Sequence, residues 1–231
     1  MTALLETRGL SKNFGGLQAV RAVDFALDKG EVRAVIGPNG AGKTTFVSLI
    51  SGRIAPSAGT IRFEGENVTA LAAFARVQKG IAYTFQITSI YQNLTVAENV
   101  ALAAHKPGGR ASLEALERVG LADRAAQVAG TLAYGHQRLL EVAMGLALKP
   151  KLLILDEPTQ GLSDAEIDNF IGLVRDVART ATVMLIEHNM PLVMELAHRI
   201  TVMDRGAILA EGTPEQIRAN AAVQAAYLGT G

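Results

Sequence analysis

One loop constrains this chain more than any other feature of its sequence. An apolar run, Val32–Ile36, is followed directly by the segment Gly37-Pro38-Asn39-Gly40-Ala41-Gly42-Lys43-Thr44. Its spacing is G-x-x-x-x-G-K-T, and it lies between a predicted strand and a predicted helix that Gly52 ends. Glycines at these positions let backbone N–H groups turn inward around phosphate oxygens, where a side chain would clash. The pattern therefore predicts a phosphate-binding loop at the start of a helix.

Two side chains of this loop and two acids far downstream supply the chemistry that such a loop needs. Lys43 is placed to reach the β- and γ-phosphates of a nucleotide, and the Thr44 hydroxyl can ligate Mg²⁺. A second apolar run, Leu152–Leu155, ends in Asp156 and Glu157. Ligands bind at the carboxyl ends of strands in open α/β sheets, so Asp156 is a candidate to hold Mg²⁺ and Glu157 a candidate general base. Taken alone, the two acids fit an ordinary acidic strand end equally well.

The order of apolar runs and helical stretches predicts an α/β fold, with a mostly parallel sheet, an antiparallel β patch and an inserted helical subdomain. The parallel strands are expected at Val32–Ile36, Ile81–Phe85, Leu152–Leu155, Thr182–Ile186 and Ile200–Met203. The antiparallel strands are expected at Leu4–Leu10, Ala19–Leu27 and Ile61–Glu64. We expect a single domain, 1–231, in which 1–86 and 151–231 form the core and 87–150 form the helical subdomain.

Three predicted helices begin with a capping box, in which Ser or Thr is followed three residues later by Glu or Gln. The pairs are Thr95 with Glu98, Ser163 with Glu166, and Thr213 with Gln216. Pro214 stands at the first helical position of the third, where its missing N–H is not needed.

Composition excludes several classes of protein. Lys plus Arg and Asp plus Glu each number 22, which gives a formal net charge of zero, whereas nucleic-acid binders usually carry a basic excess. The chain has no cysteine, which excludes disulfides, thiolate catalysis and cysteine-bound zinc. No apolar stretch approaches the roughly 20 residues that span a bilayer, and the first eight residues lack a signal-peptide pattern. We therefore expect a cytoplasmic protein that does not bind nucleic acid.

Six further motifs, in one order with the loop, make nearly the whole chain similar to the nucleotide-binding subunit of ABC transporters. An aromatic residue precedes the loop, and a glutamine follows the strand at Ile81–Phe85. A signature-like segment comes just before a helix expected from about Gln137 to Leu148, and the acid pair, a D-loop and a histidine follow. These motifs are Phe14, Gln86, Leu132-Ala133-Tyr134-Gly135-His136, Asp156-Glu157, Gly161-Leu162-Ser163-Asp164 and His188.

The resemblance implies that the chain binds ATP with Mg²⁺ and hydrolyses ATP. Phe14 would stack on adenine, Gln86 would contact Mg²⁺ and the attacking water, and His188 would hydrogen-bond the γ-phosphate. The implied nucleotide contacts are Phe14, Gly37, Pro38, Asn39, Gly40, Ala41, Gly42, Lys43, Thr44, Thr45, Leu132, Ala133, Tyr134, Gly135 and His136. The implied metal contacts are Thr44, Gln86 and Asp156, and the implied catalytic residues are Glu157, His188 and Gln86. Without the resemblance, Phe14 fits an ordinary surface aromatic and His188 a structural histidine.

In the family, the signature segment of one subunit grips the γ-phosphate of ATP bound to the other, so that two ATP molecules are held between two cassettes. Here Tyr134 replaces the first signature glycine, His136 replaces the terminal glutamine, and Ser163 stands at the usual D-loop aspartate. Gly135 is retained. None of these departures removes a phosphate or magnesium ligand, so an active ATPase is expected rather than a degenerate cassette.

The variant signature, Phe14-Gly15-Gly16, Glu187-His188-Asn189-Met190 and the ending Ala226-Tyr227-Leu228-Gly229 are similar to the ATPases of branched-chain amino acid importers. This similarity implies an ATPase subunit that drives import by ATP-sandwich dimerisation, bound peripherally to the cytoplasmic face of the inner (plasma) membrane. Its implied partners are a second cassette, identical or paralogous, separate transmembrane permease subunits that dock near Gln86–Asn93, and indirectly a periplasmic or extracellular solute-binding protein. The alternatives are another ABC system (urea or amide uptake, aromatic acid uptake, lipopolysaccharide export) and a non-transport ATP-dependent clamp.

Overall fold

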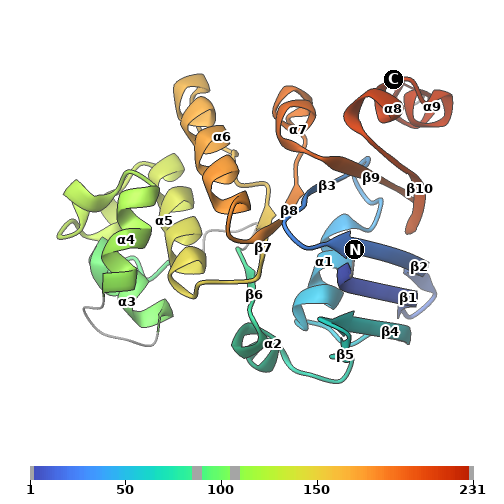
Figure 1. Ribbon diagram of the computed structural model, residues 1–231, viewed down its shortest axis with the longest axis horizontal. Helices are drawn as coiled ribbons and strands as arrows, with labels where there is room; N and C mark the ends of the chain where they lie inside the picture. The colour runs from blue at the N-terminus through green and yellow to red at the C-terminus, as the bar shows by residue number, and fades with distance from the viewer. Residues whose placement is uncertain (1–2, 85–89, 105–109, 229–231) are drawn as a thin grey trace.

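The structure, a computed structural model, describes residues 3–84, 90–104 and 110–228 (Figure 1). Its larger sheet has the strand order β10-β9-β3-β8-β7-β6. All neighbouring pairs are parallel except β9 and β10 at one edge. The strands are β3 (Val32–Ile36), β6 (Ile81–Tyr83), β7 (Leu152–Asp156), β8 (Thr182–Ile186), β9 (Arg199–Asp204) and β10 (Ala207–Gly212). Every residue of β3, β7 and β8 is buried, as expected for parallel strands that are covered on both faces.

The second sheet is antiparallel and has the order β2-β1-β4-β5. It consists of β1 (Ala3–Phe14), β2 (Leu17–Asp28), β4 (Ala58–Phe63) and β5 (Glu66–Asn67). The fold class predicted from the sequence is confirmed, but β1 and β2 run further than the apolar pattern indicated. Their ladder continues to the pair Phe14 and Leu17, where the side chains are exposed, because backbone hydrogen bonds rather than burial hold the hairpin end.

The helices surround the larger sheet, and those between β6 and β7 gather at one end of the molecule (Figure 1). That group contains α3 (Val96–Ala103), α4 (Arg110–Arg118) and α5 (Tyr134–Ala147). The others are α1 (Lys43–Ser51), α2 (Ala73–Lys79), α6 (Asp164–Ala178), α7 (Met190–Leu196), α8 (Pro214–Arg218) and α9 (Ala221–Leu228). Among the described residues, no helix combines the length and the apolar character that a membrane crossing requires.

The predicted helix boundaries are largely confirmed by hydrogen bonds at the caps. Glu98 accepts from the Thr95 backbone N–H at 2.7 Å, and Glu166 accepts from the Ser163 N–H at 2.8 Å. Gln216 accepts from the Thr213 N–H at 2.9 Å. Gly52 ends α1 in the left-handed conformation. The exception is α5, which begins at Tyr134, three residues before the predicted start at Gln137.

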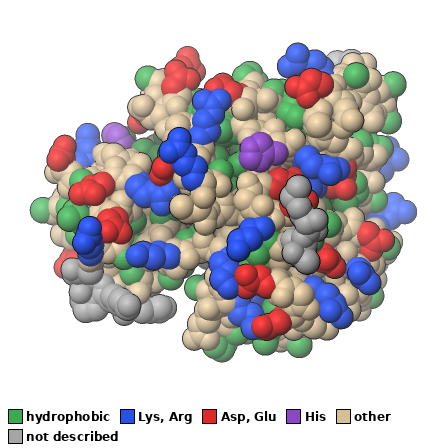
Figure 2. Space-filling view, in the orientation of Figure 1, with side chains coloured by type: hydrophobic (Ala, Val, Ile, Leu, Met, Phe, Trp, Pro, Cys, Tyr) green, Lys and Arg blue, Asp and Glu red, His purple; other side chains and the backbone are tan. Residues whose placement is uncertain are grey.

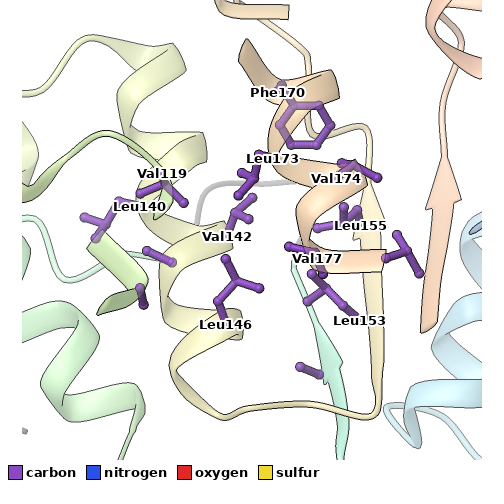
Figure 3. Close-up of a cluster of buried hydrophobic side chains, with 14 of the residues drawn as sticks. Val119, Leu140, Val142, Leu146, Leu153, Leu155, Phe170, Leu173, Val174 and Val177 are labelled. Atoms are coloured by element: carbon purple, nitrogen blue, oxygen red, sulfur yellow. The ribbon is translucent and has the colours of Figure 1, made fainter. Parts of the chain in front are cut away.

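One hydrophobic cluster joins the helical group to the sheet (Figure 3). Val142 and Leu146 of α5 lie opposite Leu173 and Val177 of α6, and Leu153 and Leu155 of β7 complete the cluster. Because helices on both sides share these buried side chains, α5 cannot leave the sheet without exposing the core.

A buried arginine fixes the end of α1 to the segment around α2. The Arg76 guanidinium donates to the carbonyl oxygens of Leu49 at 2.6 Å and Ile50 at 2.7 Å. It also donates to Thr69 and Leu71, both at 3.0 Å. Burial lowers the pKa of Arg76 to about 10, so the group stays charged at neutral pH. The last carbonyl groups of α1 therefore have a cationic partner, which a helix C-terminus favours.

Phe170→Ala should remove a large side chain from the cluster around α6, where Phe170 is 1% exposed. We expect the free energy of unfolding to fall by about 3–5 kcal/mol, because transfer and cavity costs add. The control is Phe74→Ala, whose ring is 70% exposed, and it should change stability by less than about 0.5 kcal/mol. Chemical denaturation of both variants would test this; equal losses would contradict the packing described.

Candidate functional site

Three neighbouring strands of the larger sheet deliver the candidate site residues to one edge. The loop of residues 37–42 follows β3, Glu157 follows β7, and Glu187 and His188 follow β8. The Glu157 N–H donates to the Ile186 carbonyl oxygen at 2.9 Å, which extends the β7–β8 pairing one residue past β7. The structure thus brings together four predicted residues that are far apart in sequence: Lys43, Asp156, Glu157 and His188.

Lys43 opens α1 and folds back over the loop. Its ammonium group is buried and donates to the carbonyl oxygens of Gly37 at 2.6 Å and Pro38 at 3.1 Å. Burial lowers the pKa of Lys43, while the nearby charges of Glu157 and Asp156 raise it and keep the cation in place. The residues next to Lys43, Thr44 and Thr45, are less buried, and Thr44 is exposed at the helix start.

The backbone of the loop is shaped by close contacts with β2 and with the β9–β10 turn. Gly42 has a φ of 97°, and a Cβ there would lie 2.4 Å from the Ala19 carbonyl oxygen. The Gly206 N–H donates to the Ala41 carbonyl oxygen at 2.9 Å. Gly40 also has a positive φ, of 80°, but a Cβ there would meet nothing within 4 Å. The two glycines are thus required for different reasons. Gly42 leaves room for the Ala19 carbonyl group, whereas Gly40 is needed only for its positive φ.

Asp156 is 1% exposed, and its two carboxylate oxygens have different surroundings. Oδ2 accepts a hydrogen bond from the Tyr83 hydroxyl at 2.7 Å, whereas Oδ1 has no hydrogen-bond partner among the described residues. Burial raises the pKa of this carboxyl, Glu157 adds to the rise, and Tyr83, Arg138 and Lys43 oppose it. A buried oxygen left without a donor is what a cation would satisfy, so Asp156 and the exposed Thr44 hydroxyl fit a Mg²⁺ ion.

Glu157 and His188 form a pair at the exposed side of this edge. Glu157 Oε1 lies 3.1 Å from His188 Nε2. Glu157 adopts a φ of 48°, which is uncommon for a residue with a side chain. The imidazole is half-exposed and the carboxylate is partly exposed, so solvent reaches both groups.

Glu187 is a buried residue that the sequence analysis did not include among the site residues. Its carboxylate accepts from the Thr159 N–H at 3.1 Å and from the Thr159 hydroxyl. It also accepts from the N–H groups of His188 at 2.8 Å and Asn189 at 3.2 Å. Glu187 thereby ties the segment after β7 to the segment after β8. The available signal was an acid directly after an apolar strand, the same pattern that drew attention to Asp156 and Glu157.

The segment 132–136 lies against the turn at 161–162 rather than in the cluster just described. A Cβ on Gly161 would lie 2.5 Å from the Tyr134 ring, and one on Gly135 would lie 2.7 Å from the Leu162 side chain. His136 Nε2 is 3.6 Å from Glu166 Oε1 on α6. Tyr134, Gly135 and His136 form the first turn of α5, whereas the sequence analysis placed them before the helix. As in the first turn of any helix, their N–H groups have no carbonyl group four residues earlier within the helix to bond to.

Phe14 and Gln86 are the two predicted site residues outside these groups. Phe14 closes β1 at the hairpin end, its side chain is 48% exposed, and Lys12 Nζ lies 5.1 Å from the ring centroid. β2, the other strand of the hairpin, contacts the loop through Ala19. Gln86 lies outside the described residues.

Comparison with known proteins decides the family. Residues 20–160 match the family model described as ABC transporter. The chain is 41% identical to the high-affinity branched-chain amino acid transport ATP-binding protein BraF of Pseudomonas aeruginosa, with 98% of each chain covered. The protein belongs to the ABC transporter ATP-binding family. Its identity to the corresponding protein LivG of Escherichia coli K12 is also 41%, over 98% of both chains.

Solved structures of ABC cassettes share the fold along the whole chain. A nucleotide-free ATP-binding cassette from an ABC transporter superposes with a TM-score of 0.90 at 27% identity, covering 98% of this chain and 99% of the other. The ADP conformation of an ATP-binding cassette of an ABC transporter also gives 0.90, at 26% identity and with 99% and 100% covered. Residues 207–231 match a second model, described as branched-chain amino acid ATP-binding cassette transporter. The protein is thus an ABC cassette, a family that binds nucleotide and hydrolyses ATP.

Two glycines of the loop in this ABC cassette should differ in their tolerance of a methyl group. Gly40→Ala should cost about 1–2 kcal/mol, because only its positive φ is strained. Gly42→Ala should cost about 3 kcal/mol or more, because its Cβ also meets the Ala19 carbonyl. Each kcal/mol lowers the midpoint of thermal unfolding by about 2–4 °C for a chain of this size, so calorimetry would separate the two. Equal midpoints would show that β2 does not restrict the loop.

Proposed function

We propose that this cassette is the ATP-hydrolysing subunit of an importer for branched-chain or related amino acids. The observation that carries the proposal is the near full-length match, 41% identical over 98% of both chains, to proteins named as branched-chain amino acid transport ATP-binding proteins. The separate match of residues 207–231 to the branched-chain amino acid cassette model supports the same substrate class.

The side chains at the sheet edge can bind phosphate, accept a proton and hold a metal ion, the three roles that ATP hydrolysis requires. Lys43 and the loop N–H groups bind the β- and γ-phosphates. Glu157 accepts a proton from the attacking water, and His188, 3.1 Å from Glu157, orients that carboxylate and donates to the γ-phosphate. Thr44 and Asp156, with Gln86, would hold Mg²⁺, which supplies positive charge to the phosphates. The products are ADP and inorganic phosphate.

Dimerisation is the step that couples this chemistry to transport in our proposal. Each ATP is held by the phosphate-binding loop of one cassette and by the segment 132–136 of the other, identical or paralogous. The first turn of α5 suits this role, because its N–H groups have no partner within the helix and the helix dipole favours an anion. Binding of ATP closes the pair, and hydrolysis opens it.

The permease would dock at a groove and at the predicted contact segment Gln86–Asn93, of which residues 86–89 lie outside the described part of the chain. A cavity of about 210 Å³ lies where α2 and β6 meet α3 and α5, and mostly apolar side chains line it. The outline of the molecule is indented between the part that carries α3 to α5 and the part that carries α2 (Figure 2). We propose that residues 87–150 act as the helical subdomain and 1–86 with 151–231 as the core, so that the groove lies at their junction. The cassette then sits on the cytoplasmic face of the membrane, with a solute-binding protein on the far side.

Charged side chains of both signs share one face of the molecule (Figure 2). Lys, Arg, Asp and Glu side chains are interspersed on the face that Figure 2 shows. A phosphate backbone favours a continuous basic stripe, which this face does not present. A pull-down from native membranes that returned a permease and an amino-acid-binding protein would support the proposed substrate class; a sugar, urea or lipopolysaccharide system would contradict it.

Glu157→Gln should retain ATP and accumulate a dimer, because the general base is lost while every phosphate contact stays. The measurement is light scattering with saturating Mg·ATP and the natural companion cassette. The control is Lys43→Ala, which should lose nucleotide affinity with its phosphate contact and remain monomeric. If Glu157→Gln hydrolysed ATP at the wild-type rate, Glu157 would not be the base.

Phe14→Ala should weaken ATP binding by about 1–2 kcal/mol, the scale of one aromatic stacking contact. That corresponds to a rise of about 5- to 30-fold in Kd, measured by titration calorimetry. Phe74→Ala removes a more exposed ring on α2 and should leave the Kd unchanged. An unaltered Kd in Phe14→Ala would mean that the ring only packs against the hairpin.

A further inference from the structure

Tyr83, the last residue of β6, is hydrogen-bonded to the Asp156 carboxylate at the end of β7. β6 and β7 are parallel neighbours in which Tyr83 pairs with Ile154, two residues before Asp156. The Tyr83 hydroxyl reaches forward and donates to Asp156 Oδ2 at 2.7 Å. Thr84 supports the same junction, since its N–H donates to the Ile154 carbonyl oxygen at 2.9 Å.

The hydrogen bond distinguishes the two oxygens of a buried carboxylate. With Oδ2 engaged, the rotation of the Asp156 side chain about its last bond is restricted, and Oδ1 is the oxygen without a partner in the described part of the chain. Oxygen ligands of metals are commonly oriented by a hydrogen bond to their second atom.

A second side chain, Arg53, also contacts Tyr83. The Arg53 guanidinium carbon lies 5.4 Å from the ring centroid, and Arg53 Nη1 lies 3.5 Å from the hydroxyl oxygen. Arg53 and Tyr83 both line the groove of about 210 Å³. Arg53 therefore contacts both the ring and the hydroxyl of Tyr83 while the hydroxyl donates to Asp156, which restrains the side chain as a support for a ligand requires.

We propose that Tyr83 is a positioning residue for the metal-binding carboxylate: its hydroxyl holds Asp156 by Oδ2 so that Oδ1 is presented to the divalent cation that accompanies the nucleotide. This inference rests on the proposed function, because it takes Asp156 as a metal contact. It assigns Tyr83 no contact with the nucleotide or the cation.

Tyr83→Phe tests the inference, because it keeps the ring against Arg53 and removes only the hydroxyl. The probe is Mn²⁺ in place of Mg²⁺, titrated in the presence of ADP and followed by the electron paramagnetic resonance signal of free Mn²⁺. We expect Mn²⁺ affinity to fall about tenfold, the lower end of the effect of losing a hydrogen bond to a metal ligand. ADP affinity measured in EDTA should not change, because no nucleotide contact is removed.

The matched control is Tyr91→Phe, which removes a hydroxyl from an exposed ring whose backbone, rather than its side chain, bonds to Asn99. It should leave both affinities at wild-type values. Wild-type Mn²⁺ affinity in Tyr83→Phe would overturn the inference and leave the proposed function intact. An equal loss of metal-free ADP affinity would also overturn it, since a general disturbance of the fold predicts that result. Absence of Mn²⁺·ADP binding in the wild-type protein would overturn both.

Discussion

The parallel pairing of β3, β8 and β7 is the constraint on which the rest of the site depends. Ile186 in β8 pairs with Val35 in β3 and with Asp156 in β7, so the three strands end within one residue of one another. The residues that follow the three strands must then emerge at the same edge: the glycine loop after β3, Glu157 after β7, and Glu187 with His188 after β8. The strands are buried throughout, which makes a shift of register costly, since it would move apolar side chains and break the ladder together. The relative positions of the residues at the edge are therefore set by the packing of the buried strands.

Charge at that edge is arranged so that each buried ion faces an opposite one or a set of donors. Lys43 lies near Asp156 and Glu157, and the two acids offset the cost of burying its ammonium group. The buried charge of Glu187 is compensated by hydrogen bonds instead, which the carboxylate accepts from Thr159 and from two successive backbone N–H groups. Because those donors belong to the segments after β7 and β8, the buried carboxylate also sets the spacing between the two segments. His188, which pairs with Glu157, donates its own N–H to Glu187 and is therefore held by the same carboxylate.

Much of this could be predicted from the sequence, and the exceptions have physical reasons. The central strands β3 and β8 and the helix α1 that Gly52 ends were predictable, because continuous apolar runs and glycine spacing are local signals. The edge strand β10 was missed, since only its last residue is buried and its pattern is mixed. The start of α5 was placed three residues late, because Tyr134 begins the helix by packing on Gly161, a contact with a distant turn. The bonds made by Tyr83 and Glu187 were also beyond reach, because they join residues 73 and 28 positions apart.

The cationic cap that Arg76 places on the C-terminal carbonyls of α1 has a mechanical consequence. At its other end the same helix begins at Lys43, inside the loop that is wedged against β2 and the β9–β10 turn. A helix clamped at both termini behaves as a stiff rod of about 14 Å, given its nine residues at 1.5 Å each. The two contacts tie the segment after β3 to α2, which borders the groove, and they limit fraying at both ends of the helix.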